Sequence, residues 1–294
     1  MRCREFALRR SDGSVYPLNG KDHGAYIRDP AGLGFSASPT FADLKGGFFV
    51  PTSDDAEPQQ TFTGTIVFTK LPYQTYRKFA VWLGTAKQLE LCYTPVPGET
   101  FYKQLSVNYI SKGELNSVGW LEIPFSFYQD SPWYRSVAGD PLVIAVTSDE
   151  NVRRYDYFYD EDLHYGEGAA GVLAGEIRNV GSKPGYLMLQ YVGACSNPTI
   201  RITGKTSGTT YGLCSANTSL TASDRLYYSS RPDNAYLQKI AADGSITDLL
   251  DVIRNLNNCW AALPPDEPCA LSLEADTPLL GDASVQIFNY WGSV

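Results

Sequence analysis

Apolar and polar positions alternate along much of the chain with the two-residue period of β-strands. Residues 5–18 hold two such runs around Asp12 and Gly13, a dipeptide that favours a tight hairpin turn because glycine tolerates positive φ. Further strands are predicted at the segments TFTGTIVFTK, QLELCYTP, FYKQLSVNYISKG and LNSVGWLEIPFSFYQ. In the third of these, Leu105, Val107 and Tyr109 alternate and are expected on one side of the strand.

Residues 71–85 carry the helical period of the first half. Pro72 suits the first position of a helix, and Gly84 can end it. The side chains expected on the buried face are Tyr76, Phe79, Ala80 and Leu83. A helix packed on one side of antiparallel strands predicts an α+β arrangement for this half.

The second half is predicted to be almost all β. Residues 130–141, DSPWYRSVAGDP, interrupt the pattern and are the best candidate boundary, so we expect one domain over 1–136 and another over 137–294. The strands expected beyond it are LVIAVT, YDYFY, GEIRNV, GYLMLQYVG, TIRITG, GTTYGL, RLYYSS, NAYLQKI, CALSLEA and SVQIFNYW. Many short strands separated by turn residues are typical of a β-sandwich or jelly roll. The segment ITDLLDVIRNL is the exception and predicts a short helix or a helical turn.

Composition agrees with a mainly β, soluble protein. The 294 residues are 43% hydrophobic and 19% charged, and 26 Gly, 18 Pro and 20 Tyr favour short strands and turns. The sequence has no run of eighteen apolar residues and begins without the apolar stretch of a secretion signal, so we expect synthesis in the cytosol and no membrane span. A formal charge of -8 argues against nucleic-acid binding, although an acidic surface suits a protein beside which DNA passes.

Cysteine and histidine usage predicts neither a metal site nor a disulfide framework. Six cysteines occur without short regular spacing, and we expect reduced, mostly buried thiols. His23 and His164 have no histidine partner nearby, which disfavours zinc. No cofactor site is expected either. The cysteines are Cys3, Cys92, Cys195, Cys214, Cys259 and Cys269.

Two glycine motifs resemble phosphate-binding loops but lack the required context. Residues 32–37, GLGFSA, fit a dinucleotide fingerprint, yet Pro30 and Pro39 break the strand and helix that should flank it. Gly204-Lys205-Thr206 is the tail of a P-loop whose first glycine is replaced by Thr199. We interpret the first as a loop and the second as a hairpin turn.

The segment 153–166, RRYDYFYDEDLHYG, combines aromatic rings, carboxylates and a histidine. As a strand over 155–159 it would place three tyrosines on one face, which favours packing against a core or a second subunit, with a sugar-stacking platform as the alternative. His164 and Asp162 could meet, but nothing else suggests a catalytic pair. No activated nucleophile is recognisable, and sequence cannot pair the carboxylates that a glycosidase needs.

The order of several segments resembles the distal tail (Dit) proteins of long, non-contractile-tailed phages. In the first half these are GLGF, FTGTIVF, YQTYRKFAVWL, LELCYTP, FYKQLSVNYISKGEL and LEIPFSFYQDSPWY. In the second half they are IRNVGSKPGYLMLQYVGACSNPTIRITG, LYYSSRPDNAYLQKI and NCWAALPPDEPCALSLEA. The likeness spans most of the chain as patterning and spacing; LPPDEPCAL departs from the proline-glycine turn common in the family at that place.

The resemblance implies a structural protein of a phage or prophage tail tip. It implies a ring-forming N-terminal belt domain, assembled as a hexamer, and a C-terminal galectin-like sandwich. Its partners would be copies of itself, the tail tube protein and a tip or fibre protein, with a receptor-binding protein or host glycan as a further one. Its place would be the virion tail tip, after assembly in the host cytoplasm. A ring of like subunits needs two different complementary patches, for which 41–63 and 101–123 are the candidates.

Two alternatives stay open at this stage. One is a carbohydrate-binding sandwich acting through an exposed aromatic face, with Tyr227, Tyr228 and Tyr236 as candidate contacts with a glycan or a protein partner. The other, more remote, is a glycan-degrading enzyme. For the structural reading we expect no catalytic, cofactor-binding or metal-ligating residues.

Overall fold

The computed structural model describes residues 4–20, 24–34, 41–44, 48–51, 59–138, 143–146, 171–254 and 258–293. The chain divides into two compact units, Met1–Arg135 with Trp291–Val294 and Ser136–Tyr290. Both are built mainly of antiparallel strands, as the alternating pattern predicts. Within these residues no helix has the length and apolar character needed to cross a membrane.

Unit 1 is a strongly curved antiparallel sheet with one helix, α1 (Pro72–Gly84). Its strands are β1 (Glu5–Arg10), β2 (Val15–Pro17), β3 (Asn19–Gly20), β4 (Ala25–Ala31), β5 (Phe41–Leu44), β6 (Phe48–Pro51), β7 (Thr61–Phe68), β8 (Leu89–Val96), β9 (Glu99–Ile110) and β10 (Leu121–Gln129). Eight of them pair in the order β2-β1-β8-β9-β10-β7-β4-β3. The backbone N–H of buried Leu18 donates to Phe6 (2.8 Å) and its carbonyl accepts from Ile27 (2.8 Å), so the two ends of the path meet around the core.

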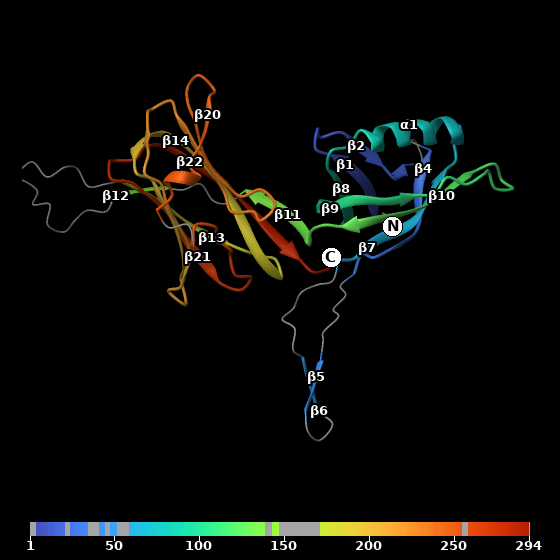
Figure 1. The fold of residues 1–294 in the computed structure, drawn as a ribbon, viewed down its shortest axis with the longest axis horizontal. Coiled ribbons are helices and arrows are strands. Elements are labelled where there is room, and N and C mark those ends of the chain that lie inside the picture. The colour runs from blue at the N-terminus through green and yellow to red at the C-terminus, as the bar shows by residue number, and fades with distance from the viewer. Residues whose placement is uncertain are drawn as a thin grey trace, which may run out of the picture. The chain divides into compact units, whose positions relative to one another are not determined.

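Helix α1 forms and packs as its sequence predicts (Figure 1). Pro72 opens it, and Phe79 and Leu83 are its buried residues. The ring of Phe79 lies 4.9 Å from Tyr16 and 5.7 Å from Phe68, measured between ring centroids. The helix therefore covers the core between the opening hairpin and β7. That hairpin turns at Gly13, whose φ of 82° confirms the need for glycine there.

Unit 1 also receives a residue from far along the sequence. Trp291 is assigned to this unit and packs against its core, with its ring edge on Phe101 at 5.2 Å. Trp133, fully buried at the start of β11 (Trp133–Ala138), fills the same core. The compact unit is therefore discontinuous in sequence.

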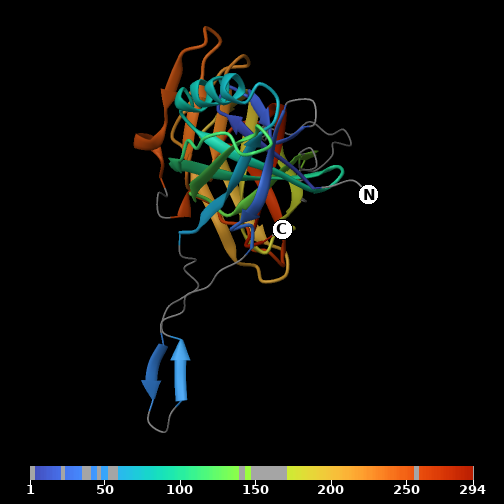
Figure 2. The ribbon, with the colours of Figure 1, turned by 90° about the vertical axis from the view of Figure 1, so that its right-hand side faces the viewer.

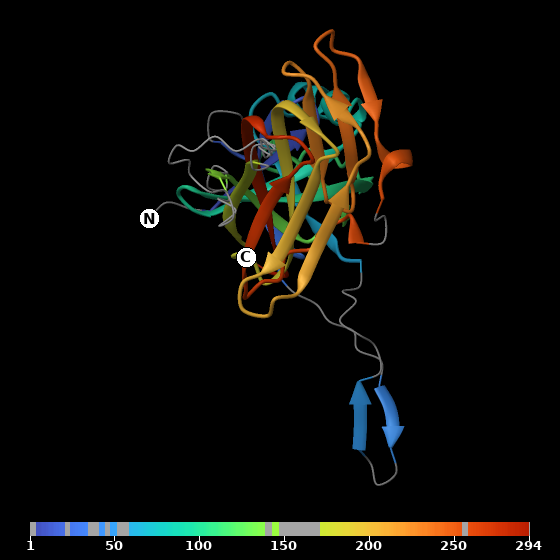
Figure 3. The same ribbon diagram turned by 90° about the vertical axis from the view of Figure 1, so that its left-hand side faces the viewer.

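Unit 2 consists of two antiparallel sheets that enclose one core. Its elements are β12 (Val143–Val146), β13 (Gly171–Arg178), β14 (Lys183–Ser196), β15 (Thr199–Gly204), β16 (Thr210–Ser215), β17 (Ser219–Leu220), β18 (Arg225–Ser229), β19 (Tyr236–Ile240), β20 (Ile246–Asp248), the 3-10 turn η1 (Leu250–Val252), β21 (Pro268–Glu274) and β22 (Leu280–Trp291). One sheet has the order β20-β19-β18-β14-β22, and the other β12-β13-β21-β15-β16 (Figure 3).

Burial alternates strictly along four strands of unit 2, β14, β15, β16 and β21, and this alternation explains the sandwich. In β14, Leu187, Leu189 and Tyr191 point inward while their neighbours are partly exposed. In β21, Leu271 and Leu273 do the same from the opposite sheet. Each sheet buries one apolar face against the other. The helical turn predicted within ITDLLDVIRNL is present as η1, after a three-residue strand.

The expectation that all cysteines are reduced is wrong for one pair. The sulfurs of Cys214 and Cys259 lie at bonding distance, with a sequence separation of 45 and 4.2 Å between their Cα atoms. Cys92, Cys195 and Cys269 are free, and the latter two are buried as expected. Spacing along the sequence gave no sign of the pair because the fold brings together a position within β16 and a distant position in the connection between β20 and β21.

Candidate functional site

Residues 106–110, at the C-terminal end of β9, have one unpaired edge. Strand β8 pairs with β9 only as far as the Leu89–Leu105 pair, whereas β10 follows the other side of β9 to Ile110. Among the described residues, nothing pairs with the free side of residues 106–110. Such an edge presents unpaired backbone N–H and C=O groups and is a ready template for another strand.

The side chains at this edge are apolar and exposed. Val107 is 47% exposed and Tyr109 51% exposed, and Tyr128 on the neighbouring strand is 39% exposed. The sequence predicted Leu105, Val107 and Tyr109 on one side, but the pairing shifts between Ser126 and Phe127, so that Val107 lies opposite Phe127 and Tyr109 opposite Ser126. This bulge sends Tyr109 to the other face of the sheet. Only Leu105 of the three reaches the core.

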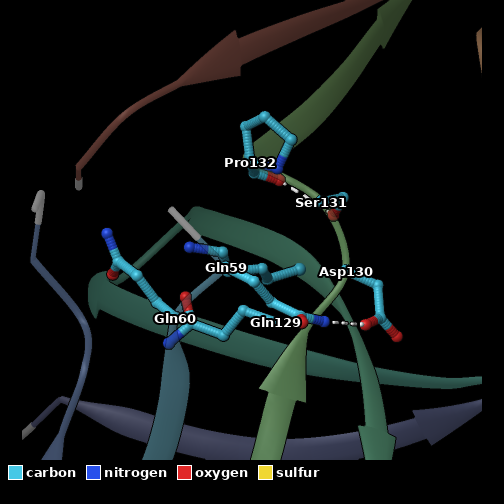
Figure 4. A pocket seen from close by; sticks show the side chains of 7 residues that line it. Gln59, Gln60, Gln129, Asp130, Ser131 and Pro132 are labelled. Carbon is cyan, nitrogen blue, oxygen red and sulfur yellow. Dashed lines mark hydrogen bonds between the residues drawn. The ribbon is translucent and has the colours of Figure 1, made fainter. Parts of the chain in front are cut away.

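A polar pocket of about 390 Å³ adjoins the open edge (Figure 4). Its lining residues are Gln59, Gln60, Lys103, Gln129, Asp130, Ser131 and Pro132. Asp130 accepts hydrogen bonds from Ser106 Oγ at 2.5 Å and from Gln59 Nε2 at 3.4 Å, which ties the pocket to the start of the free edge. No sequence motif links these positions, which lie far apart in the chain, so the pocket could not be predicted from the sequence.

Gln129 and Lys103 are the two buried polar residues among those that line the pocket. The Nε2 of Gln129 donates to the carbonyl of Gly32 at 2.6 Å, while its buried Oε1 has no hydrogen-bond partner among the residues that the structure describes. An unpaired buried acceptor is unfavourable until a donor reaches it. Among the described residues, Gln129 therefore contributes one unsatisfied buried acceptor beside the pocket.

Strands β5 and β6 form a separate two-stranded sheet within unit 1 (Figure 2). Their register runs from the Phe41–Pro51 pair to the Leu44–Phe48 pair. Seven of the eight residues in FADL and FFVP are apolar, with Asp43 as the exception. A lone two-stranded hairpin is marginally stable in water, so an apolar one calls for a covering partner. It lies within the segment 41–63 that the sequence analysis assigned to assembly.

The three tyrosines proposed as glycan contacts do not share a face. Tyr228 is 1% exposed in the core of unit 2, so its assignment as a surface contact is wrong. Because residues 227 and 228 are consecutive in a strand, Tyr227 points to the opposite side, where Tyr236 also lies through its pairing with Ser229. Tyr227 and Tyr236 are both half-buried, and their role as contacts stays a prediction.

The Gly204-Lys205-Thr206 turn already holds a carboxylate. The N–H groups of Thr206 and Ser207 donate to Glu267 Oε1 at 2.8 and 2.6 Å, and the hydroxyl of Tyr211 donates to its other oxygen at 2.7 Å. These hydrogen bonds, led by the Ser207 N–H, lower the pKa of Glu267 to about 2. The amides that a phosphate would need are occupied, and the turn is the hairpin turn between β15 and β16 that the sequence predicts.

Several sequence predictions lie outside the described residues. They are the segment 153–166 with Asp162 and His164, His23, and the end of the GLGFSA motif. The start of that motif, Gly32 to Gly34, follows β4 without forming a strand or helix.

Comparison with known proteins identifies relatives of both the sequence and the fold. Residues 5–130 match the family described as the distal tail protein, N-terminal domain. No curated protein matches the chain. Among solved structures, the chain is similar to a protein of the activated phage P2 baseplate with calcium, at 15% identity and a TM-score of 0.65 over 100% of both chains. It is also similar to the SPP1 Dit (gp 19.1) protein, at 12% identity and a TM-score of 0.57 over 97% of this chain and 98% of that one.

Proposed function

Because residues 5–130 match the N-terminal domain of the distal tail protein family, we propose that the chain is a structural protein of a phage or prophage tail tip. In this role it assembles with copies of itself into a hexameric ring that connects the tail tube to the host-adsorption apparatus. It acts by presenting surfaces to other tail components and not by transforming a ligand. Assembly takes place in the host cytoplasm, and the ring then resides in the virion.

The open edge of β9 carries this proposal. A ring of like subunits needs two different patches on each copy, because its contacts run from the head of one subunit to the side of the next. The free edge at residues 106–110, with exposed Val107 and Tyr109, supplies one patch. The apolar β5–β6 hairpin supplies an element that has no partner strand among the described residues. Both fall within the segments 41–63 and 101–123.

The remaining features support the same role. Unit 1 is proposed as the ring-forming belt and unit 2 as the outer, galectin-like sandwich that faces tip, fibre or receptor-binding proteins. The charge of -8 suits a channel through which DNA passes without adhering. Likeness to proteins of two phage tail assemblies, found over almost the whole chain, fits this division of labour.

A double substitution at the open edge tests the proposal. We expect the full chain, co-expressed with the tail tube protein of the same phage, to form rings that are visible by electron microscopy and native mass spectrometry. Val107→Lys with Tyr109→Lys should abolish the rings, because two ammonium groups would be desolvated at the contact. Circular dichroism and melting of the variant subunit should match the wild type, since both side chains are exposed.

The matched control introduces the same charges elsewhere. Val180 and Ile246 in unit 2 are 60% and 64% exposed, and their replacement by lysine should leave ring formation unchanged. Rings formed equally well by the edge variant would contradict the assignment of the edge. Loss of rings in both variants would point to a general effect of charge and not to a defined interface.

A further inference from the structure

Cys214 and Cys259 join two different kinds of backbone in unit 2. Cys214 lies in β16, at the edge of the sheet β12-β13-β21-β15-β16, and is 2% exposed. Cys259 is fully buried in the irregular connection between β20 and β21, of which the structure describes residues 249–254 and 258–263. We refer to this segment as the 249–263 connection.

The 249–263 connection forms backbone hydrogen bonds with residues at the end of the edge strand β16. The N–H of Arg254 donates to the carbonyl of Ser215 at 2.9 Å, and the N–H of Asn217 donates to the carbonyl of Val252 at 3.0 Å. Further along, the connection lies so close to β16 that a Cβ added to Gly212 would be 2.5 Å from the Cβ of Ala261. The connection thus covers part of an edge that would otherwise offer itself to other strands.

The same connection fills the core through its own side chains. Leu249, Ala261 and Leu263 are buried in the cluster that both sheets of unit 2 enclose. The hydroxyl of Tyr228 donates to the carbonyl of Cys259 at 2.6 Å and accepts from the N–H of Ala261 at 3.1 Å. An irregular segment held mainly by these contacts opens more readily than the strands around it. A covalent link to β16 would oppose that opening.

The free thiols contrast with this pair. None of Cys92, Cys195 and Cys269 is joined to another described cysteine. Oxidation therefore has one well-placed target among the described cysteines.

We propose that Cys214 and Cys259 are a redox staple that is open as a dithiol in the reducing cytoplasm and closes as a disulfide after the protein reaches an oxidising medium. The location outside the cell rests on the proposed function in a virion. The oxidant is a low-molecular-weight disulfide such as oxidised glutathione. One cysteine thiolate attacks it and releases one glutathione thiolate; the second cysteine thiolate then attacks the mixed disulfide and releases the other. Two protons and two electrons leave the cysteines, and one glutathione disulfide becomes two thiols.

The disulfide would hold the 249–263 connection in place over the edge of β16. Because both sulfurs are buried, the exchange takes place when the 249–263 connection opens transiently, and closing the bond removes that open state. A tail protein that must persist outside the cell would gain protection of a sheet edge against pairing with other chains.

The central experiment compares two forms of one unmodified chain. The full-length protein is purified under reductant and then exposed to oxidised glutathione. We expect mass spectrometry to find the peptides of Cys214 and Cys259 linked and the other thiols free to alkylation. Hydrogen exchange of residues 249–254 and 258–263 should slow several-fold on oxidation, and the melting temperature of unit 2 should rise by roughly 5–10 °C. Equal exchange and melting in both forms, or a failure to link, would overturn the proposal.

Variants separate the pair from the other thiols. Cys214→Ala should melt at one temperature with or without the oxidant, whereas the control Cys195→Ala should keep the full oxidation-dependent shift. An oxidation-dependent shift that persists in Cys214→Ala would overturn the assignment. The comparison is made within each variant, so a change in basal stability does not obscure it.

A second arm tests the timing. Infected or prophage-induced cells and released particles are quenched with N-ethylmaleimide before lysis and analysis. The dithiol should dominate in cells and the disulfide in particles; an equal disulfide content in both would refute the switch. If the chain closes the staple but forms no ring when it is co-expressed with the tail tube protein, the redox inference stands and the proposed tail function fails.

Discussion

The two units differ in how many large apolar side chains and unpaired strand edges they expose. Among the described side chains, the large apolar residues exposed in unit 1 are Val15, Leu71, Tyr73, Val81, Val96, Val107, Tyr109, Leu115, Val118 and Tyr128. Those exposed in unit 2 are Val180, Ile246, Leu250 and Val252. Unit 1 also leaves part of β9 unpaired, whereas in unit 2 an irregular segment covers the end of an edge strand. Among the described residues, unit 1 therefore exposes more large apolar side chains than unit 2 and offers more surface suited to partners.

The interiors of the two units differ in composition as well. The core of unit 1 is rich in aromatic rings, such as Phe62, Phe125 and Phe127, with centroids 5.0–5.2 Å apart for successive neighbours. That of unit 2 is mainly aliphatic, with Leu271 and Leu273 fully buried. Both cores consist of fully or nearly fully buried apolar side chains. The main contrast between the units therefore lies in their surfaces.

The largest effect should come from opening either core. Phe125→Ala is expected to destabilise unit 1 by about 3–5 kcal/mol, and Leu271→Ala to destabilise unit 2 by about 2–5 kcal/mol, through lost burial and a residual cavity. Calorimetry of each variant should show one transition lowered and the other nearly unchanged. A common shift of both transitions would contradict the division of the chain into two units with separate cores.

A smaller effect should follow from removing one buried hydroxyl. Tyr228→Phe deletes the hydrogen bonds to the Cys259 carbonyl and from the Ala261 N–H, leaving two buried backbone groups unpaired. We expect a loss of about 1–3 kcal/mol, confined to unit 2. Tyr191→Phe is the matched control, because Tyr191 is also buried in unit 2 and its hydroxyl donates at 3.0 Å to the carbonyl of Ala194 within its own strand. Urea titration of both variants would distinguish a held connection from a generic tyrosine effect.

The pH dependence of unit 2 should report on Asp224. Its hydrogen bond from Lys239, at 2.8 Å, and that from the Thr221 N–H lower the pKa of the Asp224 carboxyl from 3.8 to about 2. Because the pKa is lower in the folded protein than in the unfolded chain, the ionised carboxylate stabilises the fold at pH values above the unfolded-state pKa. This contribution is lost as the pH falls from about 4 to about 2. Asp224→Asn should therefore cost about 1 kcal/mol at pH 7 and almost nothing near pH 2. A cost that stays constant between pH 7 and pH 2 would exclude the carboxylate as its cause.

The smallest effect is expected at the open edge of unit 1. Tyr109→Ser should change the stability of the isolated subunit by less than about 0.5 kcal/mol, because a half-exposed ring contributes little to the core. Chemical denaturation followed by fluorescence would measure it. A loss comparable to that of a core substitution would show that Tyr109 serves the fold of unit 1 and would weaken the contrast between the two units.

The sequence predicted those elements whose signals are local. The opening hairpin needs a glycine at Gly13, helix α1 begins at Pro72, and burial alternates along β14, β15, β16 and β21 of unit 2. The open edge was not predictable, because it depends on how far β8 follows β9. The bulge at Ser126–Phe127 likewise moved Tyr109 to the other face against a regular alternation.

The remaining misses have the same origin in tertiary structure. Tyr227 and Tyr228 are consecutive and of one type, so the sequence shows that they point in opposite directions but not which one enters the core. Cys214 and Cys259 are far apart in the chain and belong to no motif. In each case the deciding information is which strands become neighbours.

Because unit 1 is discontinuous in sequence, its core cannot be completed before unit 2 has been translated. The ring of Trp291 packs on Phe101, yet the ribosome reaches codon 291 only after it has made the whole of unit 2. When residues up to the end of β10 have left the ribosome, unit 1 can fold only without this aromatic contact. Its core is completed only after the second unit has been synthesised.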